Sequence, residues 1–197
     1  MSSNTQERTY IDSNIWFAYI TQDKFGEESD QANKIIDDII RQKNSVAVIS
    51  HLAILEVVNV IRNKVVQKTK HRGQLDLNLE TELRQTANEL IKEFLDKTTK
   101  WSIAEKLEIF EVTKPLVEVW KNTFLIQNAI LGQIIEVHKC KICKGVFNGY
   151  TYKGVDHYDI QHALIAQEAK VNFLATFDKG YNELRDVFRD SFEIKIY

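Results

Sequence analysis

The sequence has 197 residues, of which 44% are hydrophobic and 27% charged, and its formal net charge is −2. Two cysteines do not make a disulfide framework, no apolar run approaches the roughly 18 residues of a membrane helix, and the polar N-terminal segment lacks a signal-peptide core. These features predict one soluble, cytoplasmic domain over residues 1–197 with no membrane contact, and they exclude nucleic-acid binding through bulk charge, so that any such site must be a local basic patch.

Short apolar strands alternate with amphipathic helices along the chain. The strands are predicted at 9–11, 45–50, 107–112, 171–178 and 192–197, and the helices after Asp12 and at 28–44, 51–66, 76–97, 115–130, 156–170 and 180–188. This alternation predicts a three-layer α/β/α fold with a mostly parallel central sheet. A helical insertion at about 67–106 and a hairpin insertion at about 132–154 interrupt the pattern, and the second holds four of the seven glycines.

Four acidic residues fall where strands end or where helices begin. Asp12 follows the first strand, Glu56 lies about two turns into the helix after residues 45–50, and Asp159 lies near the start of the helix that leads into the fourth strand. Asp178 closes the fourth strand, and Asp156 is a fifth candidate one helical turn before Asp159. Each acid alone also fits a cap, a turn or a solvated helix position. Because ligands bind outside the carboxyl ends of parallel strands, their joint placement favours one common site.

Carboxylates gathered in one cleft require protons or a cation. Two of them about 4 Å apart repel by roughly 4 kcal/mol at a surface-like dielectric. Oxygen ligands suit Mg²⁺ or Mn²⁺, and such ions promote in-line displacement at phosphorus. The pattern therefore predicts metal-dependent hydrolysis of a phosphodiester.

Three segments of the chain resemble the motifs of the PIN-domain family. "YIDSNIW" resembles its opening strand, "VISHLAILEVVNVI" its second motif with a serine six residues before the acid, and "DIQHALIAQEAKVNFLATFD" its third, which ends in Thr-x-Asp. The motifs stand in the family's order, and the resemblance covers residues 9–66 and 107–197.

The resemblance implies that Asp12, Glu56, Asp159 and Asp178 form the metal site, with Asn14 and Thr176 as polar supports. The small residues Ala163 and Ala166 follow Asp159 along the helix. This spacing places Asp159, rather than Asp156, at the position of the family's third acid. The implied activity is metal-dependent cleavage of single-stranded RNA by an endoribonuclease, often the toxin of a toxin–antitoxin pair, with an antitoxin or another inhibitory protein and a second copy of the chain as possible partners. The two insertions depart from compact toxins and leave the subtype, the substrate and the partner open.

The cysteine pair Cys140 and Cys143 admits several interpretations. With His157 and His162 it has a Cys₂His₂ zinc spacing, with His138 or a second subunit it could form a zinc knuckle, and reduced thiols without metal are the third interpretation. The alternative to a nuclease is a non-catalytic module, built around this hairpin, that binds nucleic acid or protein.

Two basic stretches are candidates for RNA contacts. The hairpin interleaves cations with aromatic side chains that could stack on unpaired bases, although it could equally be a solvated hairpin whose aromatics pack on the domain: Lys139, Lys141, Lys144, Lys153, Phe147, Tyr150 and Tyr152. The second stretch could also be a solvated helix end: Arg62, Lys64, Lys68, Lys70 and Arg72.

Overall fold

Five parallel strands form the central sheet of the computed structural model, which describes residues 6–22, 29–70, 77–130, 135–139, 146–150 and 157–197. The strand order is β3-β2-β1-β6-β7, and the strands span Leu107–Phe110, Ser45–Ser50, Glu7–Ile11, Phe173–Thr176 and Glu193–Ile196 respectively. In the centre of the sheet, Tyr10 lies opposite Val48 on one side and Leu174 on the other. The predicted α/β class with five sheet strands is confirmed.

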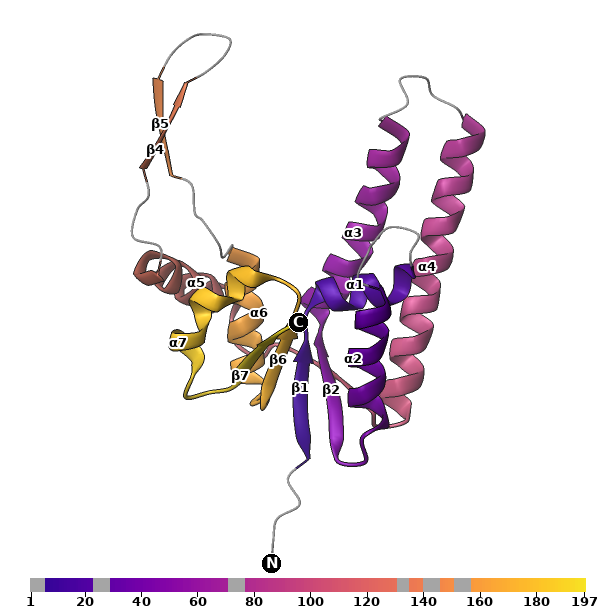
Figure 1. Cartoon of the computed structure of the whole chain (residues 1–197), viewed down its shortest axis with the longest axis horizontal. Coiled ribbons are helices and arrows are strands. Elements are labelled where there is room, and N and C mark those ends of the chain that lie inside the picture. The colour runs from indigo at the N-terminus through magenta and orange to yellow at the C-terminus, as the bar shows by residue number, and fades with distance from the viewer. Residues whose placement is uncertain (1–5, 23–28, 71–76, 131–134, 140–145, 151–156) are drawn as a thin grey trace, which may run out of the picture.

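Helices cover both faces of this sheet (Figure 1). Side chains alternate between the faces along a strand, so Ile11 packs in one apolar cluster and its neighbour Tyr10 in another. The first cluster joins the sheet to α1 (Ser13–Thr21), α2 (Ser29–Arg41), α3 (His51–Lys70) and α4 (Leu77–Ile103). The second joins it to α5 (Leu116–Ile130), α6 (His157–Glu168) and the C-terminal α7 (Arg185–Phe188). The predicted three-layer arrangement is therefore present.

The predicted helical insertion contributes to the core. Ala87, Leu90 and Phe94 on α4 are buried in the first cluster, and the ring of Trp16 on α1 lies 6.1 Å from Phe94 and 6.0 Å from Trp101. The helix runs six residues beyond the predicted end at Lys97, and a left-handed residue, Glu105 (φ 57°), follows it. The C-terminal part of α4 thus lies along the sheet, whereas α3 and the N-terminal part of α4 run beyond the carboxyl ends of the strands (Figure 1).

Other local boundaries differ from the predicted ones. The third strand ends at Phe110. The predicted helix 180–188 opens as a 3-10 helix, η1 (Lys179–Leu184), which the Asp178 carboxylate caps by accepting a hydrogen bond from the Gly180 amide at 2.7 Å. The predicted hairpin is present as the antiparallel pair β4 (Ile135–Lys139) and β5 (Val146–Tyr150).

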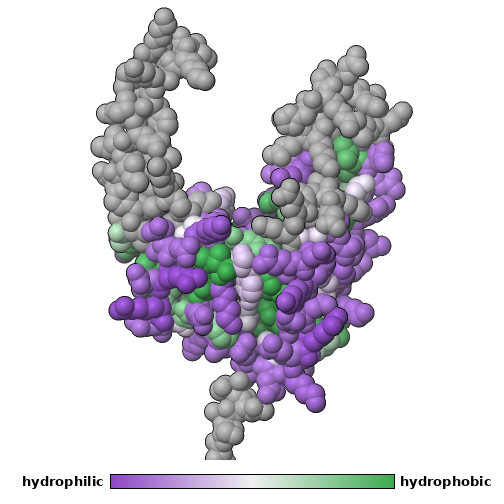
Figure 2. All heavy atoms as spheres, in the orientation of Figure 1, coloured by the Kyte–Doolittle hydropathy of each residue, from purple (hydrophilic) through white to green (hydrophobic). Residues whose placement is uncertain are grey.

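The hairpin and the outer ends of α3 and α4 project past the carboxyl ends of the sheet strands, on opposite sides of the sheet (Figure 1). Hydrophilic side chains cover most of the described surface in the same view, and apolar surface emerges near the middle of this face and on the side of α5 (Figure 2). Among the helices that the structure describes, none has the length and apolar character required to cross a membrane.

Replacing Trp16 should show how strongly α1 and α4 depend on each other. Its side chain is fully buried and donates a hydrogen bond from Nε1 to the Ile11 carbonyl at 3.1 Å. We expect Trp16→Ala to lower the free energy of unfolding by about 3–5 kcal/mol, measured by urea denaturation. Val187→Ala, at a side chain 45% exposed on α7, should change it by less than about 0.5 kcal/mol. Equal losses in the two variants would contradict this packing.

Candidate metal centre

Asp12 occupies the junction between β1 and α1. Its backbone amide donates to the Ala175 carbonyl of β6 at 3.0 Å, and its Oδ1 accepts a hydrogen bond from the Ser13 amide at 2.7 Å, which caps α1. The residue is only 3% exposed. Asp12 is therefore a helix cap and a buried acid at the sheet edge at the same time, and the two interpretations from sequence do not exclude each other.

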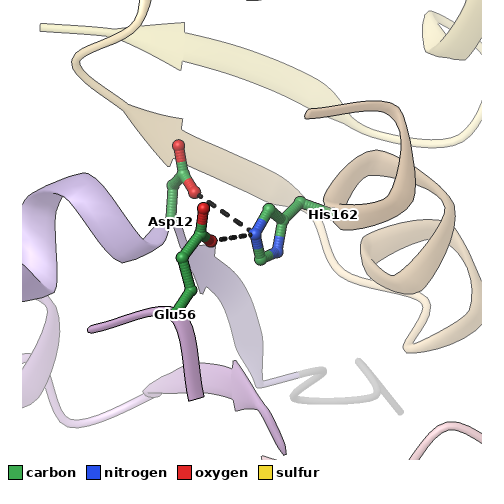
Figure 3. Close-up of side chains that lie close together, drawn as sticks. All are labelled: Asp12, Glu56 and His162. Atoms are coloured by element: carbon green, nitrogen blue, oxygen red, sulfur yellow. Dashed lines mark hydrogen bonds and ion pairs between the residues drawn. The ribbon is translucent and has the colours of Figure 1, made fainter. Parts of the chain in front are cut away.

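Glu56 and His162 come to the same place from helices on opposite faces of the sheet (Figure 3). His162 Nε2 lies 2.7 Å from Glu56 Oε2 and 3.9 Å from Asp12 Oδ1. One ligand atom from each of the three side chains lies within 4.8 Å of the others. These three residues form a group that could hold a metal ion, and we call it the metal centre.

The other ring nitrogen of His162, Nδ1, contacts a side chain of the central sheet. Nδ1 lies 2.7 Å from the Tyr10 hydroxyl, which lies 2.8 Å from Ser50 Oγ. Ser50 Oγ in turn accepts a hydrogen bond from the Ala53 amide in the first turn of α3. Because Tyr10 and Ser50 belong to adjacent strands, the sheet fixes the orientation of the imidazole ring.

A second chain of hydrogen bonds orients Asp12. The Thr176 hydroxyl donates to Asp12 Oδ2 at 2.7 Å and accepts from Asn14 Nδ2 and from the Asp178 amide, each at 3.0 Å. Asn14 Oδ1 accepts from the Phe177 amide at 3.3 Å. Both carboxylate oxygens of Asp12 therefore have fixed donors, the Ser13 amide for Oδ1 and the Thr176 hydroxyl for Oδ2, and Asn14 acts on Asp12 only through Thr176.

Burial and mutual charge shift the pKa of each member. Burial raises the pKa of Asp12, although the charge of His162 and the bond from Thr176 oppose it. For Glu56 burial would raise the pKa, but the hydrogen bond and charge of His162 and a bond from Ser13 outweigh it and lower the pKa. For His162 burial would lower the pKa, but the bond to Glu56 and the charges of Asp12 and Glu56 raise it. Without metal, a proton on His162 offsets the carboxylate charges.

The remaining predicted acids lie outside this group of three. Asp159 sits half-buried in the first turn of α6, where its charge contributes to the raised pKa of His162. Asp178 is exposed and caps η1. Asp156 falls outside the described residues. That Asp159, Asp178 or Asp156 binds metal stays a prediction.

His162 is the member of the centre that the sequence analysis did not assign to the acid site and named only in one of the open zinc interpretations. Its Nε2 atom contacts Glu56 of the metal centre, and its Nδ1 atom contacts Tyr10 in the sheet. One signal pointed to it: residues three apart share a helical face, so the face that brings Asp159 toward the sheet also brings His162.

The two cysteines of the hairpin and most of its candidate RNA contacts fall outside the described residues. Cys140 and Cys143 lie outside the described residues, as do Lys141, Lys144, Tyr152 and Lys153; Lys139 and Tyr150 lie in β4 and β5, whose backbone alone is described. The zinc interpretation therefore stays a prediction. In the other basic stretch, Arg62 is exposed on α3 and Lys64 is half-buried.

Comparison with known proteins adds no family to this description. No family model matches the sequence, and no curated protein matches it significantly.

In the metal-free protein we expect the free energy of unfolding to fall as the pH rises above 6.5, the ordinary pKa of histidine. The raised pKa of His162 means that its contribution is complete below that value and is lost as the pH rises through the raised pKa. His162→Gln should abolish this alkaline slope, and His51→Gln, at an exposed residue that starts α3, should retain it. Urea denaturation at several pH values measures the slope.

On the acid side the two carboxyl groups act in opposite directions. Because the pKa of Glu56 is lowered, its contribution to the free energy of unfolding is complete above pH 4.5 and is lost as the pH falls through the lowered pKa. Because the pKa of Asp12 is raised, protonation of Asp12 favours the folded state instead. The alkaline slope is therefore the clean test, and an equal slope in wild type and His162→Gln would contradict the assignment.

Proposed function

We propose that this chain is a divalent-metal-dependent endoribonuclease that hydrolyses phosphodiester bonds of single-stranded RNA. The observation that carries the proposal is the convergence of Asp12, Glu56 and His162 at the carboxyl end of an all-parallel sheet. The order of the three PIN-like motifs supports the same reaction, because two of these residues are acids of those motifs and the third follows Asp159 by three positions. An inhibitory antitoxin is proposed on the resemblance alone, a cytoplasmic location on the composition and the two cysteines, and a homodimer without a supporting observation.

The side chains of the metal centre fit a small divalent cation. Two carboxylates and one imidazole nitrogen, oriented by hydrogen bonds from the second layer of residues, are a ligand set that proteins use for such ions. An imidazole suits Mn²⁺ better than Mg²⁺, which strongly prefers oxygen ligands. We therefore propose Mn²⁺ as the ion that supports activity best, with Mg²⁺ as the weaker alternative.

The bound ion would supply positive charge to the phosphate oxygens and make a water molecule more acidic. Asp12, held on both oxygens, and His162, held on Nδ1, would keep their ligand atoms in place. The Glu56 side chain is 30% exposed, so it faces the solvent side of the centre. Because its pKa is lowered, Glu56 is ionised near neutral pH and would hold the ion as a carboxylate ligand, and the proton of the attacking water would pass to solvent. The water oxygen then bonds to phosphorus, the bond from phosphorus to the departing ribose oxygen breaks, and that oxygen takes a proton from solvent.

Asp12→Asn should abolish cleavage of labelled single-stranded RNA in Mn²⁺. The substitution removes a ligand carboxylate, and it also removes the cost of burying a charge while it loses the bond from Thr176. We therefore expect the metal-free free energy of unfolding to stay within about 1 kcal/mol of wild type, and the stabilisation by added Mn²⁺ to shrink. Asp190→Asn, whose side chain is 94% exposed, is the matched control and should cleave normally.

Full activity in Asp12→Asn would reject the metal centre as the catalytic site. Stoichiometric zinc in the purified protein, with no cleavage in Mn²⁺ or Mg²⁺, would favour the non-catalytic binding module instead.

Thr176→Val should separate orientation of Asp12 from ligation itself. Valine keeps the shape but can neither donate to Asp12 Oδ2 nor accept from Asn14 and the Asp178 amide. Loss of such an outer partner typically costs about 10- to 100-fold in metal affinity, and we expect that loss for Mn²⁺ by isothermal titration calorimetry. Thr176→Ser retains the hydroxyl and should bind Mn²⁺ nearly as wild type. Wild-type affinity in Thr176→Val would mean that Asp12 is held by its Ser13 bond alone.

A further inference from the structure

Aromatic side chains lie exposed where α5 meets the first turn of α6. Trp120 is 48% exposed, Phe124 62% and Tyr158 43%. The rings of Trp120 and His157 are nearly parallel, with an interplanar angle of 25° and centroids 6.0 Å apart, and the His157 and Tyr158 centroids lie 4.1 Å apart. We call Trp120, Phe124, His157 and Tyr158 the aromatic surface.

The helix α5 presents this surface because of its own periodicity. Val119 and Thr123 are buried, while Trp120 and Phe124, four residues apart, share another face with Val117, which is 76% exposed. Exposed apolar and aromatic side chains that share one helix face, rather than lying scattered, are typical of a binding surface.

We propose that the aromatic surface stacks unpaired nucleobases of the RNA strand whose phosphodiester lies at the metal centre. This inference rests on the proposed function and names where the strand would bind. His157 precedes His162 by five residues on α6, a rise of about 7.5 Å at about 1.5 Å per residue. Five residues also turn the helix by about 140°, so the aromatic surface lies on a different side of α6 from His162, at a separation that a bound strand can span.

Electrostatics favour stacking as the source of affinity. The chain carries a net charge of −2, and three acids, Asp12, Glu56 and Asp159, lie near enough to His162 to raise its pKa, so this region offers phosphates little attraction in the absence of metal. Stacking on an aromatic face does not depend on charge, and every base offers such a face. Lys121, exposed directly after Trp120, adds a cation for a neighbouring phosphate.

The flat and partly polar character of the surface favours bases over a protein partner. Trp120 and His157 already form a parallel stack, onto which a planar base can add, and the rings of His157 and Tyr158 keep polar atoms that suit a wet surface. A protein occupant is an outcome that the test below distinguishes.

The test measures binding without cleavage. Fluorescence anisotropy in EDTA reports the affinity of the full chain for a fluorescein-labelled, mixed-sequence single-stranded RNA and for an abasic strand of equal length. We expect Trp120→Leu to weaken binding of the RNA about tenfold, as for loss of one stacked base, and Trp120→Phe to retain most of the affinity. Both variants should bind the abasic strand as wild type does. Tyr197→Leu is the control, because this residue is 45% exposed and lines a cavity with α2 on the other face of the sheet.

An unchanged RNA affinity in a folded Trp120→Leu variant, judged by circular dichroism and melting temperature, would overturn the proposal. If the same variant also changed the particle mass in light scattering, the surface would belong to a protein contact. A tenfold loss of RNA binding in a chain that cleaves no RNA would reject the nuclease and keep the stacking site. Normal cleavage by the wild type, together with unchanged RNA binding in Trp120→Leu, would keep the nuclease and reject the stacking site.

Discussion

The Nε2 atom of His162 faces the carboxylates of both Asp12 and Glu56, and the rest of the site depends on this contact. Asp12 is almost fully buried, so its charge needs a positive neighbour inside the protein. The raised pKa of His162 favours a proton, and so a positive charge, at this position in the metal-free protein, and the same position suits a divalent ion. The fold can therefore form without metal and still present two carboxylates to a cation.

The parallel sheet makes this contact possible. Strands β1 and β6 are neighbours, so Asp12 at the end of one strand meets Thr176 at the end of the other. The helix α3 starts directly after β2 and carries Glu56 over the edge, and α6 brings His162 from the opposite face. The hydroxyl of Tyr10, a residue of β1, then fixes the orientation of the His162 ring through its hydrogen bond with Nδ1. Elements from four parts of the chain converge only because every strand points toward the same edge.

The fold and two of the three members of this centre, Asp12 and Glu56, could be predicted from sequence for a definite reason. Alternating strand and helix periods specify a parallel sheet, and an acid placed directly after a strand, such as Asp12, has little freedom in where it lies. On a helix, however, Asp159 and His162 share one face, and spacing does not reveal which side chain reaches the acids. That choice is made by the Tyr10 and Glu56 partners, which are remote in sequence. The contact between Trp120 and His157 likewise depends on how α5 crosses α6.

Pulsed electron paramagnetic resonance of Mn²⁺ bound to the protein tests the central claim most directly, because it detects nitrogen within the coordination sphere. The account predicts one bound Mn²⁺ that shows coupling to an imidazole nitrogen in wild type. His162→Gln should lose this coupling, and His157→Gln, five residues earlier on α6, should retain it. A bound ion without nitrogen coupling, or coupling that survives His162→Gln, would contradict the metal centre formed by Asp12, Glu56 and His162.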